Sequence, residues 1–253
     1  MNVCPTEDIE EKSNFCFERK AIMKKKMFFI ACMAVCTVYA VDHEPILHYD
    51  FTAPVVQQGG VYKQPDLPSD MKMSSPEQAL ILAGNRKQKE LIIPNSAGLS
   101  IADGGTLYAL VRFDQDGKKA GQNDAHDMIL FKNGSFLFGR ACNTLYFNMG
   151  RKWDWKITAE NIPTGRWTSL AVSVKKNEPR NYTVKLYIDG RKVADKNFRK
   201  EADAPNENPV SIGKGWGGPW LFCGLLGKIM IFDQALTDDQ IARMSEAEPL
   251  LKK

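Results

Sequence analysis

The feature that most constrains the fold of this chain is an alternation of apolar and polar residues that ends in Asp-Gly. Every second side chain of one segment is apolar: Tyr182, Val184, Leu186 and Ile188. A period of two places these side chains on one face of a β-strand. The Asp189-Gly190 pair that follows favours the tight turn of a β-hairpin. The segment therefore predicts an antiparallel sheet with one buried face.

Other short apolar segments and turn signals predict more strands. The expected strands cover residues 47–51, 78–83, 89–94, 106–113, 128–131, 135–140, 144–148, 165–174, 210–213 and 224–232. Asn133-Gly134 predicts a second hairpin, and residues 114–127 a polar loop. One helix is expected to begin at Thr237, because Gln240 three residues later completes a capping-box pattern. Many short strands with a single helix predict an all-β, antiparallel β-sandwich.

The order of four segments resembles the closing third of a laminin G-like domain of the concanavalin A-like lectin/glucanase superfamily. The segments are Tyr182–Ala194, Val210–Gly213, Gly224–Phe232 and Gln234–Met244. The segments at 47–51, 104–113 and 165–174 are similar to earlier strands of that family. The resemblance covers nearly all of the chain after residue 45. It implies a concanavalin A-like jelly-roll β-sandwich with one short C-terminal helix.

The first 40 residues have the pattern of a targeting segment. Residues 23–40 combine a basic start, an apolar run and a Val38-Tyr39-Ala40 end, which predicts a secretory signal peptide cleaved after Ala40. Met23 is then the expected start, residues 1–22 a misassigned upstream extension, and residues 41–253 one domain. A lipoprotein site at Cys32 or Cys36 is the alternative. The protein is expected to be secreted, periplasmic or on the surface of a bacterium, without a transmembrane segment after cleavage.

Composition excludes some classes of protein. A hydrophobic content of 43% and a charged content of 25% are ordinary for a globular domain. The net charge of +4 is weak and the basic residues are scattered, so we expect no nucleic-acid partner. Only Cys142 and Cys223 of the six cysteines remain after residue 40. The sequence leaves open whether these two form a disulfide or are free thiols.

Enzymatic function is not favoured by the pattern of carboxylates. The resemblance implies that a glucanase of the superfamily would carry an E-x-D-x-E or E-x-D-x-x-E strand, whose alternate residues share a face. The nearest match, Glu201-Ala-Asp203 with Glu207, has one residue too many and contains Pro205. We interpret it as a solvated loop and predict no catalytic residues. A glycoside hydrolase, or an accessory domain of one, remains an alternative function.

The tryptophans are the best functional signal, because indoles stack on the apolar faces of sugar rings. Four of the five are expected in loops or at strand ends: Trp153, Trp155, Trp216 and Trp220. The polar residues expected to assist are Arg140, Arg151 and Asp154. Trp167 is assigned to the core. The sequence therefore predicts a non-catalytic, lectin-like domain for a glycan or polysaccharide, with rim packing of the rings and a protein-binding adhesion module as alternatives.

A calcium ion is a possible cofactor implied by the resemblance, since related domains hold one with carboxylate and carbonyl oxygens. The family's acidic pair falls on Gly227 and Lys228 of this chain, which replaces an expected anion with a cation. The remaining weak candidates for calcium ligands are Asp50 and Asp103.

Overall fold

The computed structural model describes residues 43–52, 57–59, 71–75, 77–84, 91–94, 97–114, 126–150, 155–215 and 220–252. The chain divides into two units, Met1–Ala40 and Val41–Lys253, and every described residue belongs to the second. The predicted signal peptide therefore lies outside the described residues and stays a prediction. No helix in the described part of the chain is long and apolar enough to cross a bilayer.

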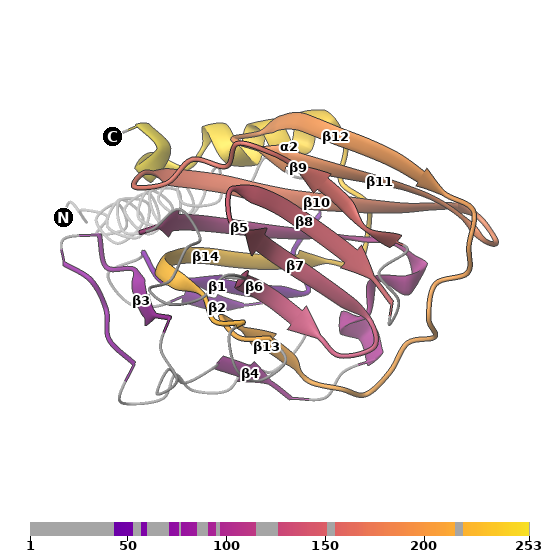
Figure 1. The fold of residues 1–253 in the computed structure, drawn as a ribbon, viewed down its shortest axis with the longest axis horizontal. Coiled ribbons are helices and arrows are strands. Elements are labelled where there is room, and N and C mark those ends of the chain that lie inside the picture. The colour runs from indigo at the N-terminus through magenta and orange to yellow at the C-terminus, as the bar shows by residue number, and fades with distance from the viewer. Residues whose placement is uncertain are drawn as a thin grey trace, which may run out of the picture. The chain divides into compact units, whose positions relative to one another are not determined.

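Two antiparallel sheets form the sandwich shown in Figure 1. Within the described residues, the larger sheet contains eight strands in the order β12-β11-β10-β5-β14-β1-β2, with β3 also paired to β14. These are β1 Leu47–Asp50, β2 Gln57–Gly59, β3 Leu80–Ala83, β5 Gly105–Phe113, β10 Trp167–Glu178, β11 Asn181–Ile188, β12 Arg191–Phe198 and β14 Cys223–Phe232. The smaller sheet has the order β4-β13-β6-β7-β8-β9. Its strands are β4 Leu91–Ile93, β6 His126–Lys132, β7 Phe136–Ala141, β8 Thr144–Met149, β9 Ile157–Ala159 and β13 Val210–Ile212. The predicted all-β sandwich is confirmed.

The hairpin predicted from Asp189-Gly190 joins β11 to β12. Both turn residues have positive φ angles, 50° for Asp189 and 75° for Gly190, as a type I′ turn requires. A Cβ atom on Gly190 would also lie 3.0 Å from the Cα of Ala242, so the helix packs directly against the turn. The Asn133-Gly134 hairpin is confirmed as well. Its loop has three residues, and Gly134 supplies the positive φ angle of 71°.

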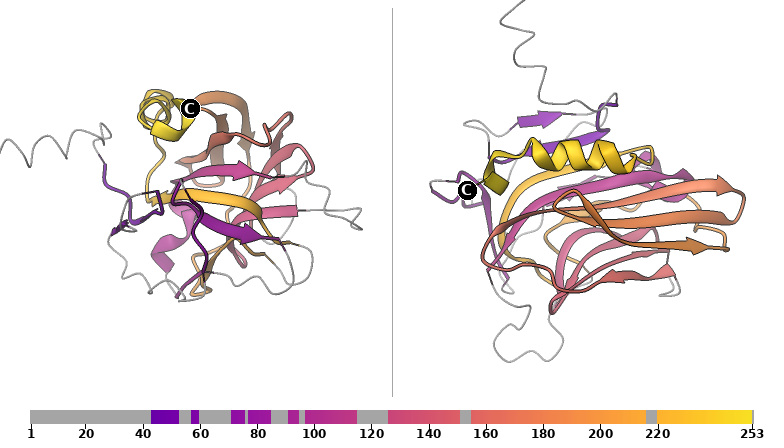
Figure 2. Two further views of the ribbon diagram at one scale, coloured as in Figure 1. Left: turned by 90° about the vertical axis from the view of Figure 1, so that its left-hand side faces the viewer. Right: turned by 90° about the horizontal axis from the view of Figure 1, so that it is seen from above.

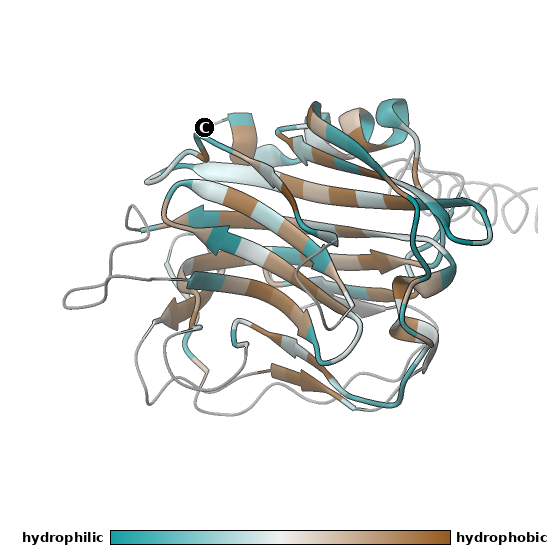
Figure 3. Cartoon of the chain, turned by 45° about the vertical axis from the view of Figure 1, so that its right-hand side comes forward, coloured by the Kyte–Doolittle hydropathy of each residue, from teal (hydrophilic) through white to brown (hydrophobic). Residues whose placement is uncertain are grey.

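Both faces of the larger sheet pack against other elements, the outer face only in part. One face packs against the smaller sheet and forms the main core, while the other packs beneath α2, Asp238–Glu246, and the 3₁₀ helix η4, Pro249–Lys252 (Figure 2). All ten residues of β14 are therefore buried, and Figure 3 shows apolar residues along the strands of this sheet. Helix α2 begins after Thr237, whose capping box with Gln240 is present as predicted. Ile241 and Met244 of the helix face the sheet.

Trp167 is buried as predicted, with 8% of its surface exposed, but not between the two sheets. It belongs to the cluster beneath α2. Strand alternation explains this position: Leu170 and Val172 of the same strand point into the main core, whereas Trp167 and Ala171 point to the other face.

The structure corrects several boundaries. β2 and β9, which have three residues each, were not predicted. β6 begins at His126, inside the segment predicted to be a polar loop. Cys142 and Cys223 are both free thiols, which decides between the two alternatives that the sequence left open.

Candidate functional site

Trp155 does not lie on the surface, so its predicted role in binding is wrong. Only 5% of Trp155 is exposed. Its ring stacks on Phe198 at 5.1 Å between centroids and meets Tyr182 edge-on at 5.1 Å. The segment before β9 thus inserts this indole into the main core, where an apolar ring is more stable than in water.

Arg140 is the second correction, because it is fully buried and cannot reach a glycan. Its Nε and Nη2 atoms donate to Oδ2 of Asp127 at 3.0 and 2.7 Å. Its guanidinium carbon lies 3.9 Å from the centroid of Phe113. Asp127 also accepts the backbone N–H of Cys223 through Oδ1 at 2.8 Å. This buried ion pair therefore ties β6 and β7 to the start of β14.

Four other predicted residues lie outside the described residues: Arg151, Trp153, Asp154 and Trp216. Trp220 is the one predicted indole that the structure places near the surface, and it is half-buried. Gly150, the last described residue before Arg151, Trp153 and Asp154, can be located relative to Trp220. Gly150 donates to the carbonyl of Ser135 at the end of β7 and β8 that is farther from Trp220. The six residues of β8 separate the two ends by roughly 16–20 Å.

Trp220 belongs to an aromatic cluster that we define as His126, Tyr146 and Trp220. The Trp220 and His126 rings are parallel within 3°, with centroids 4.1 Å apart. Nδ1 of His126 is 3.2 Å from the hydroxyl of Tyr146, and these two rings meet edge-on. A parallel β-bridge between His126 and Trp220 fixes the backbones as well. The indole is therefore held in one orientation.

The aromatic cluster lies on the outer face of the smaller sheet. Phe138 and Phe147 point into the main core, while their neighbours Leu137 and Tyr146 join Met128, Phe131 and Trp220 in a separate cluster. Alternation along the strands places this second cluster on the opposite face. Sequence reasoning missed His126, because a ring contact between residues 94 positions apart leaves no local pattern.

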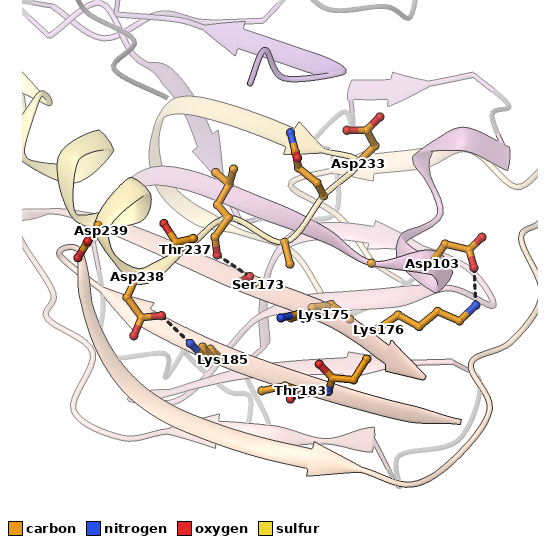
Figure 4. A pocket seen from close by; sticks show the side chains of 16 residues that line it. Asp103, Ser173, Lys175, Lys176, Thr183, Lys185, Asp233, Thr237, Asp238 and Asp239 are labelled. Carbon is orange, nitrogen blue, oxygen red and sulfur yellow. Dashed lines mark hydrogen bonds and ion pairs between the residues drawn. The ribbon is translucent and has the colours of Figure 1, made fainter. Parts of the chain in front are cut away.

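A groove, which we call the α2 groove, lies on the outer face of the larger sheet (Figure 4). It has a volume of about 760 Å³. Its floor is formed by outward-pointing residues of the β10–β11 hairpin, and one wall by residues 233–239 before and at the start of α2. The pairs Ser173–Lys185 and Lys175–Thr183 are direct neighbours across this hairpin. The alternation of apolar and polar residues that predicts the hairpin also indicates that these polar side chains lie on one face of it.

An ion pair lies on each of two sides of the α2 groove. Lys185 lies 2.6 Å from Oδ1 of Asp238, which also accepts a hydrogen bond from Tyr187 at 2.9 Å. The pKa of Asp238 is lowered, chiefly by the hydrogen bond from Lys185. Partial burial acts in the opposite direction, and the hydrogen bond from Tyr187 lowers the pKa further. On the other side, Lys176 lies 2.6 Å from Oδ1 of Asp103. Asp103, a weak candidate for calcium, thus contacts an ammonium group.

Asp50, the other weak calcium candidate, also contacts a lysine. Lys228 lies 3.4 Å from Asp50 and 2.9 Å from both carboxylate oxygens of Glu248. Burial raises the pKa of Glu248. Burial acts in the same direction on Asp50, but the charge of Lys228 and two hydrogen bonds from Thr52 outweigh it, so the pKa of Asp50 is lowered. The Lys228 ammonium therefore supplies a positive charge between these two carboxylates.

Carboxylates and histidines are the side chains that would hold a metal ion or act as a general acid or base. Within the described residues, no group of three or more His, Cys, Asp and Glu side chains is arranged to hold a metal ion. Glu201, Asp203 and Glu207 lie in the segment between β12 and β13, which has no regular secondary structure. The loop interpretation of these three carboxylates agrees with this position.

Comparison with known proteins identifies relatives of the fold. The laminin G-type family model described as the concanavalin A-like lectin/glucanases superfamily matches residues 85–242. No curated protein matches the sequence of this chain. Among solved structures, domain 4 of AbnA, a GH43 extracellular arabinanase from Geobacillus stearothermophilus solved with arabinotriose, is similar with a TM-score of 0.56 and 19% identity. The match covers 81% of this chain and 100% of that domain.

Two botulinum neurotoxin binding domains are also similar in fold. Serotype D aligns with a TM-score of 0.63 and 11% identity over 81% of this chain and 52% of that chain. Serotype G aligns with a TM-score of 0.61 and 13% identity over 80% of this chain and 51% of that chain. This protein therefore spans about half the length of the neurotoxin domains.

Proposed function

This chain belongs to the concanavalin A-like lectin/glucanases superfamily, and from that membership we propose that it is a secreted, non-catalytic domain that binds a glycan. Trp220 of the aromatic cluster provides a stacking surface for a sugar ring. The expected location is outside the cytoplasm of a bacterium, in the periplasm, at the cell surface or in the medium.

The orientation of Trp220 is the observation that carries this proposal. Its indole lies parallel to the His126 ring at 4.1 Å, and the contact of His126 with Tyr146 restrains the pair further. A restrained ring loses little conformational entropy when it binds, which increases affinity. A half-buried indole with one polar N–H also suits a surface that is partly apolar and partly wet.

The similar structures support the proposal at the level of fold. Domain 4 of AbnA was solved in complex with arabinotriose, and its whole length aligns with this chain. A shared fold does not transfer a ligand, because one fold carries many functions. Arabino-oligosaccharides are therefore a first probe of specificity, within a wider panel of plant and bacterial glycans.

The decisive experiment compares Trp220→Ala with the unchanged protein on a glycan array that includes arabino-oligosaccharides. Loss of a stacking contact worth about 0.5–1.5 kcal/mol weakens binding by roughly two- to tenfold. The melting temperature should change by only a few degrees, because Trp220 is half-buried. The matched control is Trp155→Phe, which changes a buried indole and should leave glycan binding intact. Absence of binding to any glycan, or unchanged binding by Trp220→Ala, contradicts the proposal.

An accessory domain of a glycoside hydrolase is the second candidate. One observation favours it: the aligned relative is a single domain of an extracellular arabinanase. The test is a search for sugar release from a polysaccharide mixture by this protein alone and with an added arabinanase. Stimulation of the added enzyme without release by the protein alone would support the accessory role. If the protein is instead a protein-binding adhesion module, no glycan on the array should retain it.

A further inference from the structure

We propose that the α2 groove is a second glycan site, which binds a neutral sugar segment by hydrogen bonds, on the face opposite to the aromatic cluster. This inference rests on the proposed function, since it assigns a second site for the same class of ligand. It also predicts a property that a single site cannot give, namely cross-linking of polysaccharide chains by one domain.

The wall of the α2 groove is preformed. Thr106 donates its hydroxyl to the carbonyl of Gln234 at 2.8 Å and accepts the N–H of Leu236 at 2.8 Å. Ser173, on the floor, donates to the carbonyl of Leu236 at 3.0 Å. Thr237 then caps α2. Residues 234–237 are thus attached to β5, β10 and the helix, so little ordering is needed when a ligand binds.

The charges that line the groove are largely neutralised in pairs. Lys176 pairs with Asp103, and Lys185 pairs with Asp238. Three lining charges have no side-chain partner among the described residues: Lys175, Asp233 and Asp239. They provide ammonium donors on the floor and carboxylate acceptors on the wall (Figure 4).

The mixture of donors and acceptors selects the class of ligand. None of the described lining residues carries an aromatic ring, so the groove cannot use stacking. A hydroxyl group both donates and accepts, and a sugar presents several hydroxyls. Hydroxyls can therefore donate to Asp233 and Asp239 and accept from Lys175. An anionic glycan would bring a further negative charge near these two carboxylates, so a neutral glycan is favoured.

The volume fits a short oligosaccharide. Small-molecule sites have volumes of roughly 300–1,000 Å³, and the groove has about 760 Å³. The groove and the aromatic cluster lie on the outer faces of the larger and smaller sheets. Stacked sheets are about 10 Å apart before outer side chains are counted. A trisaccharide cannot reach both sites, so each site engages a different chain segment.

The test uses linear arabinan and xylan as neutral polymers and polygalacturonate as the anionic one. Binding is measured by retardation in gels that contain each polymer, and cross-linking by light scattering as protein is added to the dissolved polymer. The variants are Trp220→Ala, Lys175→Met and the double variant. Lys72→Met is the control, because this exposed lysine also loses one charge but does not line the groove.

The expected result is that the unchanged protein and Lys72→Met are retarded by a neutral polymer and cross-link it. Trp220→Ala and Lys175→Met should each still be retarded but lose cross-linking, and the double variant should lose both. If Trp220→Ala alone abolishes retardation, or Lys175→Met still cross-links, the second site is wrong while the proposed function stands. Retardation by polygalacturonate alone overturns the neutral class. Absence of retardation by all three polymers counts against the proposed function and the second site together.

Discussion

The buried ion pair between Asp127 and Arg140 allows a quantitative prediction. Both side chains are at most 1% exposed. The substitution Asp127→Asn preserves the shape and leaves an amide oxygen that can accept the N–H of Cys223. It removes the negative charge of Asp127 from the buried Arg140 guanidinium.

The magnitude follows from this geometry. Breaking a buried ion pair by removing one partner costs about 3–5 kcal/mol of unfolding free energy, because the remaining charge stays desolvated. For a domain of this size, each kcal/mol lowers the melting temperature by roughly 2–4 °C, so we expect a fall of about 6–20 °C. Arg140→Met should cost a similar amount, including about 0.5–2 kcal/mol for its contact with Phe113.

The double variant, Asp127→Asn with Arg140→Met, is the informative one. It buries no charge, so it should be more stable than the sum of the two single effects predicts, with a coupling energy of at least about 2 kcal/mol. The assay is urea unfolding followed by tryptophan fluorescence. The control is Arg166→Met, whose ion pair with Asp189 is exposed and should be worth at most about 1 kcal/mol.

Two results would refute this reasoning. Additive effects of the two substitutions would mean that the guanidinium and the carboxylate do not interact in the folded protein. A single variant that loses less than about 1 kcal/mol would mean that Arg140 is hydrated. A hydrated Arg140 would be accessible to a glycan, contrary to its buried position in the structure.

Three further predictions concern other parts of the domain. The pKa of Asp50 is lowered in the folded protein, so its stabilising effect is complete above the pKa of an unfolded aspartate, about 3.9, and disappears as the pH falls through the lower folded value. Asp50→Asn should therefore flatten the dependence of stability on pH in that acidic range, as measured by urea unfolding. An unchanged slope contradicts this prediction. Thr237→Ala should cost about 0.5–2 kcal/mol, measured in the same way, because the capping box is lost; no change would mean that the helix end frays in solution. The unreduced 41–253 domain should show two reactive thiols after unfolding but slow reaction of buried Cys223 before it, whereas no thiol would indicate a disulfide.

Local patterns predicted much of the sandwich correctly. The alternation in 182–188, the Asp189-Gly190 turn and the capping box at Thr237 each involve neighbours in sequence, and all three are confirmed. Short-range sterics and hydrogen bonds determine such features, so they are readable without knowledge of the fold. The start of β6 was missed because Asp127 is polar, and its burial depends on partners distant in sequence, namely Arg140 and the backbone N–H of Cys223.

The candidate site was less predictable. Both Trp155 and Trp220 follow segments rich in Gly or charged residues, yet Trp155 enters the core and Trp220 remains near the surface. The difference depends on Phe198 and Tyr182 for the first ring and on His126 for the second. These partners are 27 to 94 positions away along the chain, so no local window contains them.

The sequence by itself determined most of the strands, their tight turns and the capped helix, since these depend on periodicity and on backbone preferences of adjacent residues. Only the tertiary structure decided which face of each strand is covered by the other sheet and which by α2. A period of two separates the side chains into two faces but does not say what packs on either. That choice placed Trp167 beneath the helix and Arg140 beside Asp127, and it left the Lys175 face of the β10–β11 hairpin open as a groove.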